Sequence, residues 1–210
     1  TYNDANYINK TIDRFLEQTT TFPFEIIVGD DCSNDSTYEK LLEYKKKYPN
    51  LIRIIRSNKN EGRLNNWLLT LSECKGAYIA MCDGDDYWTD SNKLSMQVST
   101  LESCQDYSGL YHSVNLVNKD LKVIGKLPKK GKDFNNINEF INSWYEIPTC
   151  SVMFRNFFLE SNYHKETIIF KNLKDVIDYP IDALISERGI YKFIDVNMAD
   201  YRIIKNTDSY

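Results

Sequence analysis

Three carboxylates follow an apolar segment of the chain within four residues. The segment spans residues 78–82, and Asp83, Asp85 and Asp86 come directly after it, with Gly84 inside the cluster. In extended backbone the side chains of Asp83 and Asp85 point to the same side, and carboxylates held so close repel one another unless a cation lies between them. Oxygen-rich sites of this kind suit Mg²⁺ or Mn²⁺, with phosphate oxygens completing the coordination shell. We therefore expect Asp83 and Asp85 to bind a divalent metal ion.

The other members of this cluster have different expected roles. Gly84 lets a ligand approach the backbone closely, because it carries no side chain. Asp86 is better explained as part of a solvated acidic turn before the next helix. A second acidic pair, Asp30 and Asp31, follows another apolar segment. Since ligands of doubly wound sheets bind beyond the carboxyl ends of the strands, we expect both acidic clusters to lie where such a ligand would bind.

Helices and strands are predicted to alternate over the first half of the chain. The expected helices lie near residues 4–19, 38–48, 64–71 and 91–102, and the expected strands near residues 25–29, 51–55 and 77–82. Because these strands are apolar on both faces, they predict a parallel sheet covered by helices.

The second half has a different pattern. Its expected elements are an antiparallel hairpin over residues 110–117 and 121–124, a basic loop at 128–133, a helix at 180–188, and two short strands at 191–195 and 198–203. Pro180 in the first turn and Gly189 just past the end are typical of a helix. We expect one α/β domain in which residues 1–106 and residues 107–210 share a core.

The first half resembles the family 2 glycosyltransferases of the GT-A fold, the bacterial group that builds cell-surface polysaccharides. The motifs that carry the resemblance are Thr1-Tyr2-Asn3, the runs Ile26–Thr37 and Ala77–Asp90, and Asn60-Glu61-Gly62. Ile147-Pro148-Thr149, Phe154-Arg155-Asn156, Asp178-Tyr179-Pro180, Gly189 and Tyr201-Arg202 are similar to later landmarks of one subgroup. The resemblance implies a Rossmann-like, mostly parallel sheet flanked by helices, with a small antiparallel portion. Residues 1–106 would be the nucleotide-sugar-binding half and residues 107–210 the acceptor-side half.

The resemblance also implies how a nucleotide-diphosphate sugar would be bound, most often a uridine diphosphate sugar. Tyr2, between Thr1 and Asn3, could stack on the nucleobase, and Asp30 or Asp31 would accept a hydrogen bond from the base N–H.

The diphosphate end of the donor has its own implied contacts. Asp83 would contact the ribose and the metal, and Asp85 would be the principal ligand of Mn²⁺ or Mg²⁺, which would offset charge on the leaving diphosphate. Arg63 follows the turn at Asn60 and Gly62 and could reach a phosphate. An exposed cation at a helix start is an equal alternative for Arg63.

Inverting transfer needs a carboxylate that takes the proton from the acceptor hydroxyl. The family places this base just before a short helix, at the position of Asp178. Asp175 and Asp182 compete for the role, and a helix N-cap is the structural alternative for Asp178. The implied acceptor is a glycan or a lipid-linked saccharide. Trp144 and Tyr145 could contact the acceptor or could pack in the core.

Two features depart from the family pattern. The family's first strand, about six residues long, is expected before Thr1, so we expect residues to precede Thr1 in the natural protein. Ile204 stands where the family often carries a histidine that reaches the metal or the diphosphate. Both departures keep a second function open, a degenerate, non-catalytic domain of the same fold that binds a nucleotide or a glycan. A haloacid-dehalogenase-like phosphatase is disfavoured, because Tyr87 stands where that chemistry needs Thr or Val.

Composition excludes several classes of protein. Hydrophobic residues at 42% and charged residues at 27% exclude intrinsic disorder. The net charge of −4 disfavours a nucleic-acid binder. No apolar run approaches the ~20 residues of a membrane span. Five cysteines without a C-x-x-C pair indicate reduced thiols. We expect a cytoplasmic protein that would visit the inner face of the membrane if its acceptor is lipid-linked.

Overall fold

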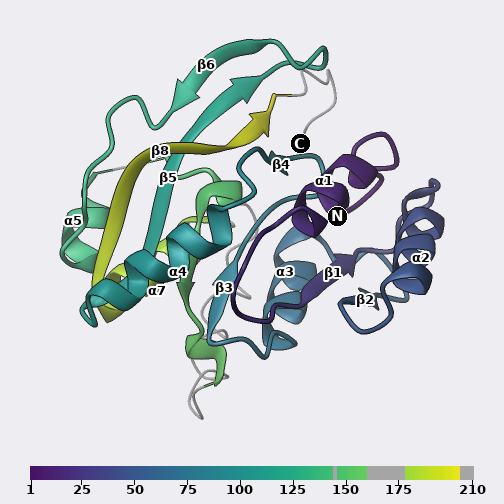
Figure 1. Cartoon of the computed structure of the whole chain (residues 1–210), viewed down its shortest axis with the longest axis horizontal. Coiled ribbons are helices and arrows are strands. Elements are labelled where there is room, and N and C mark those ends of the chain that lie inside the picture. The colour runs from purple at the N-terminus through teal and green to yellow at the C-terminus, as the bar shows by residue number, and fades with distance from the viewer. Residues whose placement is uncertain (144–145, 160–177, 204–210) are drawn as a thin grey trace.

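The computed structural model describes residues 1–143, 146–159 and 178–203. The expected α/β fold is confirmed: the described strands form two sheets that helices cover (Figure 1). The smaller sheet pairs β1 (Ile26–Asp30) in parallel with β2 (Ile52–Arg56). It packs against α1 (Ile8–Leu16) and α2 (Thr37–Lys47), with α3 (Arg63–Ser72) beside β1.

The larger sheet is mixed, with the strand order β3-β7-β5-β8-β4 and with β6 paired to β5. Its strands are β3 (Tyr78–Ala80), β4 (Tyr87–Trp88), β5 (Tyr107–Val117), β6 (Val123–Leu127), β7 (Met153–Arg155) and β8 (Ile190–Arg202). The remaining helices are α4 (Lys93–Ser103), α5 (Ile137–Ile141) and α7 (Asp178–Arg188), with 3₁₀ turns at Thr149–Ser151 and Phe157–Leu159.

Strand β5 forms the centre of the core because both of its faces are covered. Leu110 belongs to the apolar cluster that includes Leu94 and Leu101 of α4, whereas its neighbour Tyr111 belongs to the cluster that includes Ile185 of α7. Consecutive residues of a strand point to opposite faces, so α4 and α7 lie on opposite sides of the sheet. The expected hairpin is confirmed by the antiparallel pairing of β5 with β6.

Two expectations about strands are wrong. The segments expected as two strands at 191–195 and 198–203 form one long strand, β8 (Ile190–Arg202), because the interruption near Asp195 is a shift of register against β5 and not a break. The segment at 77–82 forms a strand of three residues whose partner is the antiparallel β7, so it does not extend the parallel pair of β1 and β2. The parallel sheet expected for the first half is therefore limited to β1 and β2 among the described strands.

An apolar cavity of about 430 Å³ lies between β1 and β3. Its lining includes Ile27 and Val28 of β1 and Ile79 of β3. Thr1 lies at one end, where its backbone nitrogen donates to the Gly29 carbonyl at 2.9 Å and its carbonyl accepts from the Asp31 nitrogen at 3.1 Å. This is the hydrogen-bond pattern of a parallel strand beside β1. The strand expected before Thr1 stays a prediction, and the cavity has the position and the apolar lining to receive it.

None of the described helices combines the length and the apolar character that crossing a bilayer requires. The longest described helices have 11 residues, about half of what a membrane span needs.

Candidate active site

The acidic turn after β3 is held in place by the first helix. The hydroxyl of Thr11, from α1, donates to the carbonyl oxygens of Gly84 at 2.9 Å and Asp86 at 2.6 Å. Gly84 is needed here for packing, because a Cβ at this position would lie 2.4 Å from Thr1 Oγ1 and 2.7 Å from Asp4 Oδ2. The close approach that Gly84 allows is therefore used by Thr1 and Asp4, and its contact with a ligand stays a prediction.

Three carboxylates meet at this turn. Burial, with the neighbouring carboxylates of Asp83 and Asp4, raises the pKa of Asp85 to about 6. Burial also raises the pKa of Asp4, although its Oδ2 accepts hydrogen bonds from the Thr1 hydroxyl at 2.6 Å and the Tyr2 nitrogen at 3.2 Å. The repulsion expected between Asp83 and Asp85 is therefore present, and it would fall if a cation bound between them.

Asp86 is a buried structural residue, and the expectation of a solvated turn is wrong for it. Its side chain is 1% exposed, and its Oδ1 accepts from the Arg202 nitrogen at 2.7 Å. Burial raises the pKa of Asp86 well above the usual value. The same Arg202 donates from Nε to the carbonyl oxygen of Asp85 at 2.8 Å, and its guanidinium lies 4.5 Å from the centre of the Tyr7 ring. The last described strand therefore also fixes the acidic turn, beside the start of α1.

The donor set at this turn fits Mg²⁺ or Mn²⁺. The part of the chain that the structure describes contains no group of three or more His, Cys, Asp or Glu residues arranged to hold a metal by themselves. Mg²⁺ is commonly held by one or two carboxylates together with substrate phosphates and water, so a protein cage is not required. Asp83, with a quarter of its side chain exposed, and Asp85 are the residues that would hold the ion.

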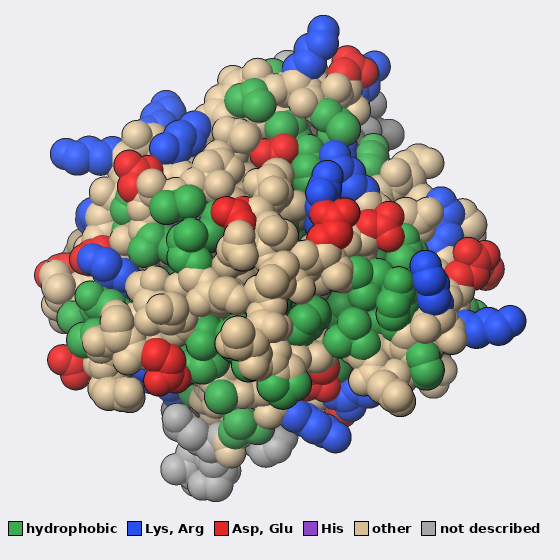
Figure 2. All heavy atoms as spheres, viewed as in Figure 1, with side chains coloured by type: hydrophobic (Ala, Val, Ile, Leu, Met, Phe, Trp, Pro, Cys, Tyr) green, Lys and Arg blue, Asp and Glu red, His purple; other side chains and the backbone are tan. Residues whose placement is uncertain are grey.

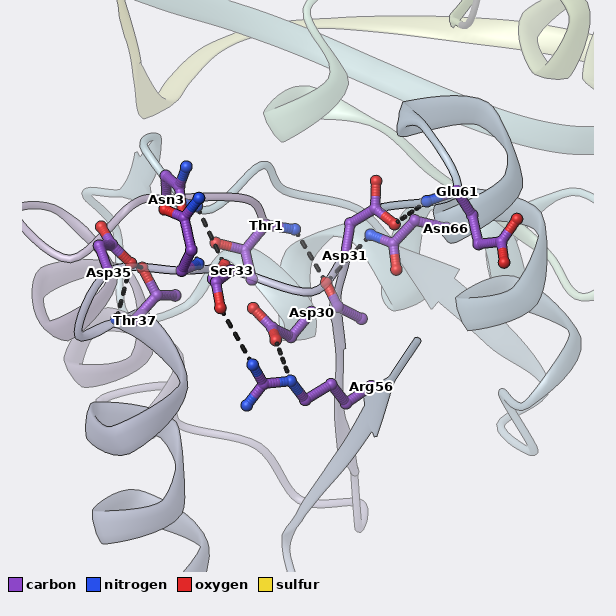
Figure 3. Close-up of polar contacts among 12 residues, drawn as sticks. Thr1, Asn3, Asp30, Asp31, Ser33, Asp35, Thr37, Arg56, Glu61 and Asn66 are labelled. Atoms are coloured by element: carbon purple, nitrogen blue, oxygen red, sulfur yellow. Dashed lines mark hydrogen bonds and ion pairs between the residues drawn. The ribbon is translucent and has the colours of Figure 1, made fainter. Parts of the chain in front are cut away.

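The second acidic pair lies at the end of β1, and its two members have different surroundings (Figure 3). Asp30 is fully buried, and its Oδ2 lies 3.3 Å from Arg56 Nε in an ion pair that lacks the angles of a hydrogen bond. Asp31 accepts from the backbone nitrogens of Glu61 at 2.8 Å and Gly62 at 3.0 Å. Asp31 thereby fixes the loop that leads into α3, and its oxygens keep lone pairs for a further donor.

The opening residues of the chain pack beside this pair. The Asn3 nitrogen donates to Ser33 Oγ at 3.0 Å, and Asn3 Oδ1 accepts from the Asn34 nitrogen at 2.9 Å (Figure 3). Asn3 has a φ of +59°, a left-handed conformation that Asn tolerates better than most residues. Tyr2 is 38% exposed, so its ring is open to a planar ligand.

The turn before α3 brings a cation to the acidic turn. Asn60 Oδ1 accepts from the Gly62 nitrogen at 3.0 Å, and Gly62, with a φ of +84°, occupies the N-cap position. Arg63 follows, and its guanidinium nitrogen Nη2 lies 3.5 Å from Asp83 Oδ2. The Arg63 side chain is 56% exposed. The structure thus brings Arg63 and Asp83 together. An arginine that contacts a phosphate near the metal would need such a position.

The acceptor side is described only in part. Asp178 is the first residue of α7, but its side chain lies outside the described residues, as do Asp175, Trp144, Tyr145 and Ile204. Asp182 is described: it is 5% exposed, and its Oδ1 accepts from the Tyr191 hydroxyl at 2.8 Å. The hydrogen bond from Tyr191 of β8 gives Asp182 a structural role, and the choice of base among Asp178, Asp175 and Asp182 stays a prediction.

Sequence reasoning did not predict the roles of three residues at this site: Asp4, Thr11 and Arg202, although Tyr201-Arg202 was among the motifs of the family resemblance. Asp4 follows the Thr1-Tyr2-Asn3 motif directly, and this adjacency is a sequence signal from which its place in the site could have been predicted. Thr11 lies in an amphipathic helix and Arg202 in a terminal strand, and neither pattern indicates contact with a turn more than 70 residues away.

Comparisons with known proteins agree with this geometry. A family model described as "Glycosyl transferase family 2" matches residues 1–160. An uncharacterised protein of Mycobacterium tuberculosis is 41% identical over 119 residues, which cover 57% of this chain and 34% of that protein. The Escherichia coli protein WfgD, named as a UDP-Glc:α-D-GlcNAc-diphosphoundecaprenol β-1,3-glucosyltransferase, is 30% identical over 125 residues, covering 60% of this chain and 47% of WfgD. The chain thus matches less than two thirds of the length of these relatives.

Solved structures show the same fold. Staphylococcus aureus TarS 1-349 in complex with UDP-GlcNAc superposes with a TM-score of 0.68 at 19% identity, over all of this chain and 59% of that one. The mannosyltransferase PcManGT of Pyrobaculum calidifontis, in complex with GDP-Man and Mn²⁺, superposes with a TM-score of 0.62 at 16% identity, over 99% of this chain and 56% of that one. At these identities the likeness shows the fold, which is GT-A.

Proposed function

Because the chain belongs to glycosyltransferase family 2, we propose that it transfers a sugar from a nucleotide-diphosphate sugar to a hydroxyl of a glycan or a lipid-linked saccharide. The observation that carries the proposal is the cluster of Asp83, Asp85 and Arg63 beside the opening residues of the chain. It combines two carboxylates for a cation with an arginine for a phosphate. The relatives WfgD and TarS, whose names or bound ligands include UDP sugars, favour a uridine diphosphate sugar.

The residues of the donor site have separate tasks in this proposal. The exposed ring of Tyr2 stacks on the base, with Thr1 and Asn3 shaping the loop that carries it. Both carboxylates are buried, but Asp30 is paired with Arg56, whereas Asp31 accepts from backbone nitrogens and keeps lone pairs, so we assign Asp31 to the base N–H. Asn60 and Gly62 form the turn that presents Arg63 to the diphosphate.

Asp83 and Asp85 hold Mn²⁺ or Mg²⁺ in this proposal. When bound, the ion supplies Lewis-acid stabilisation of the negative charge on the leaving diphosphate. Arg63 adds a second positive charge on the same side of the diphosphate. The Mn²⁺ in PcManGT, a protein of the same fold, supports the choice of ion.

We assign the transfer an inverting course with Asp178 as the base. The acceptor oxygen forms a bond to the anomeric carbon from one side, while the bond to the diphosphate oxygen breaks on the other. The acceptor proton passes to the Asp178 carboxylate, and the bonding electrons leave with the nucleoside diphosphate. The assignment rests on the position of Asp178 at the start of α7, where the family carries its base.

The place of action follows from the acceptor. WfgD acts, by its name, on a sugar linked to diphosphoundecaprenol. An enzyme with such an acceptor and a nucleotide-sugar donor would work in the cytoplasm and at the inner face of the cell membrane. A degenerate domain that binds a nucleotide or glycan without turnover is the second candidate, favoured by Ile204 in the position of the family histidine.

Calorimetry and a transfer assay together test both candidates. UDP should bind wild-type protein in the presence of Mn²⁺, and Asp85→Asn should weaken that binding and abolish turnover of UDP sugars. Asp178→Asn should keep donor binding and lose turnover, whereas Asp106→Asn, an exposed control before β5, should match the wild type. Binding without turnover of any donor would support the degenerate domain. An Asp178→Asn protein with wild-type turnover would make the assignment of the base wrong.

A further inference from the structure

The β5–β6 turn, strand β6 and the loop after it form a strongly basic segment in an acidic protein. We call residues 118–132 the basic hairpin. It contains Lys119, Lys122, Lys126, Lys129, Lys130 and Lys132 with a single acidic residue, Asp120, while the whole chain has a net charge of −4. Lys and Arg side chains project from the upper edge of the molecule near the two ends of β6 (Figures 1 and 2). The basic hairpin is therefore a locally positive element of a chain whose net charge is negative.

The basic hairpin also exposes aliphatic side chains. Leu121 is 44% exposed, Val123 60% and Ile124 56%. Val123 and Ile124 are consecutive residues of β6, so they point to opposite faces, and both are exposed, whereas Leu127 at the end of the strand packs against the core. A soluble strand normally keeps such residues against the core on one face. Large aliphatic side chains exposed on both faces of a basic segment fit insertion between lipid headgroups.

The turn of the basic hairpin, residues 118–122, lies at the same end of the sheet as the acidic turn. The loop at 128–132 lies farther back along β5, where the Tyr111 hydroxyl donates to the Lys132 carbonyl at 2.6 Å. Strands β3 and β5 both pair antiparallel with β7, and β8 runs parallel to β5, so β3, β5 and β8 all run in one direction. The acidic turn follows the end of β3, and the basic hairpin follows the end of β5. Contacts link the two: Arg202 bonds Asp85 and Asp86, and the next residue, Ile203, donates from its nitrogen to the Val117 carbonyl at 2.8 Å.

We propose that the basic hairpin docks the protein on an anionic lipid bilayer, with Lys119, Lys122 and Lys129 at the headgroups and with Leu121, Val123 and Ile124 between them. Docking there would orient the acidic turn and the bound donor toward the membrane surface, where a lipid-linked acceptor lies. This consequence rests on the proposed function. The composition favours lipid over nucleic acid, because residues 118–132 contain no aromatic side chain for base stacking. Lysine clusters beside aliphatic residues are typical of surfaces that bind acidic lipids.

Vesicle sedimentation tests the proposal directly. The full chain should bind vesicles of phosphatidylcholine with 30% phosphatidylglycerol (a chosen, roughly physiological anionic fraction) and not vesicles of phosphatidylcholine alone, and 0.5 M NaCl should release most of it. Lys119→Gln/Lys122→Gln/Lys129→Gln should lower the partition coefficient on the order of 100-fold, since each lysine near such a surface contributes about fivefold. Val123→Ser/Ile124→Ser should lower it at both salt concentrations, because the aliphatic contribution is not screened.

A matched control distinguishes binding through the basic hairpin from a general effect of positive charge on vesicle binding. Lys45→Gln/Lys46→Gln/Lys47→Gln in α2 makes the same change of charge outside the hairpin and should bind vesicles like the wild type. The proposal is overturned if the two triple variants bind equally, if wild-type protein ignores the acidic vesicles, or if the serine variant abolishes a self-association seen by light scattering instead of vesicle binding.

Calorimetry with UDP and Mn²⁺ on the same proteins keeps the two proposals apart. The hairpin variants should bind UDP like the wild type. UDP binding without vesicle binding would overturn the docking surface and leave the proposed function standing. Vesicle binding without UDP binding would support the docking surface and overturn the proposed function.

Discussion

The carbonyl oxygen of Asp85 accepts a hydrogen bond of 2.8 Å from Nε of Arg202, a residue at the other end of the chain. A second bond joins the Arg202 nitrogen to the buried carboxylate of Asp86. Arg202 thus fixes the backbone of the proposed metal site without lying among its ligands. Partners that orient metal ligands in this way commonly change metal affinity by 10- to 100-fold when they are replaced.

Replacing Arg202 should therefore weaken metal binding. We expect Arg202→Lys to lower the affinity for Mn²⁺ and UDP by roughly tenfold, because Lys has no Nε–H in that position and cannot stack its planar group on Tyr7. Calorimetry at a temperature where both proteins are folded measures the change. Arg155→Lys is the control, since Arg155 also donates to backbone carbonyls, those of Tyr107 and Leu101, but at the opposite end of the sheet. Equal loss of affinity in both variants would contradict the positioning role.

Asp31 should stabilise the loop before α3. Asp31→Ala removes the acceptors of the Glu61 and Gly62 nitrogens, and we expect the free energy of unfolding to fall by about 1–3 kcal/mol. Asp31→Asn keeps one acceptor oxygen, so its free energy of unfolding should fall by less. Urea unfolding measures the difference, and hydrogen exchange at residues 60–63 should rise in the alanine variant. Asp106→Ala, an exposed control, should change neither quantity.

The buried Lys93 should make stability depend on pH. Burial lowers the pKa of Lys93 to about 7, and its amine donates to Gln97 Oε1 at 2.7 Å. Cys82, Cys150 and His112 are the titratable groups that interact with it; burial raises the pKa of both thiols and lowers that of His112, so all three stay neutral near pH 8.

The sign of the dependence follows from proton binding. Between pH 7 and the ordinary lysine pKa of 10.5, the unfolded chain binds a proton at Lys93 that the folded chain does not. Stability should therefore rise with pH over this range, by at most about 1.4 kcal/mol per pH unit. Urea unfolding of wild type and Lys93→Met at pH 7 and pH 8.5 measures the contribution. If the stability of Lys93→Met rises with pH as much as that of the exposed control Lys46→Met, Lys93 is not the source of the pH dependence.

The cavity between β1 and β3 should accept a strand. A six-residue extension before Thr1, rich in Val and Ile, should pair with β1 and fill the apolar space. We expect the melting temperature to rise by at least about 2 °C, the shift that about 1 kcal/mol gives a domain of this size. A Gly/Ser extension of equal length is the control. If both extensions leave the melting temperature unchanged, the cavity is not a strand site.

The sequence by itself determined the two acidic clusters and those elements that have a strong local pattern. The apolar runs before Asp30 and Asp83 predicted strands, and the stripe of Leu64, Trp67, Leu68 and Leu71 predicted α3, because these patterns depend on residues close together in the chain. The order of motifs was sufficient to identify the family, since the GT-A resemblance depends on short runs at fixed spacing.

Only the tertiary structure decided how the acidic turn is supported. Asp86 looked like a solvated residue by its sequence, yet it is buried against Arg202, 116 positions later. Asp4 packs against Gly84, and Asp31 accepts a hydrogen bond that holds the 60–62 loop. Contacts of this kind join distant segments, and they form only when β8 and the first loop fold against the turn, so no local pattern can encode them.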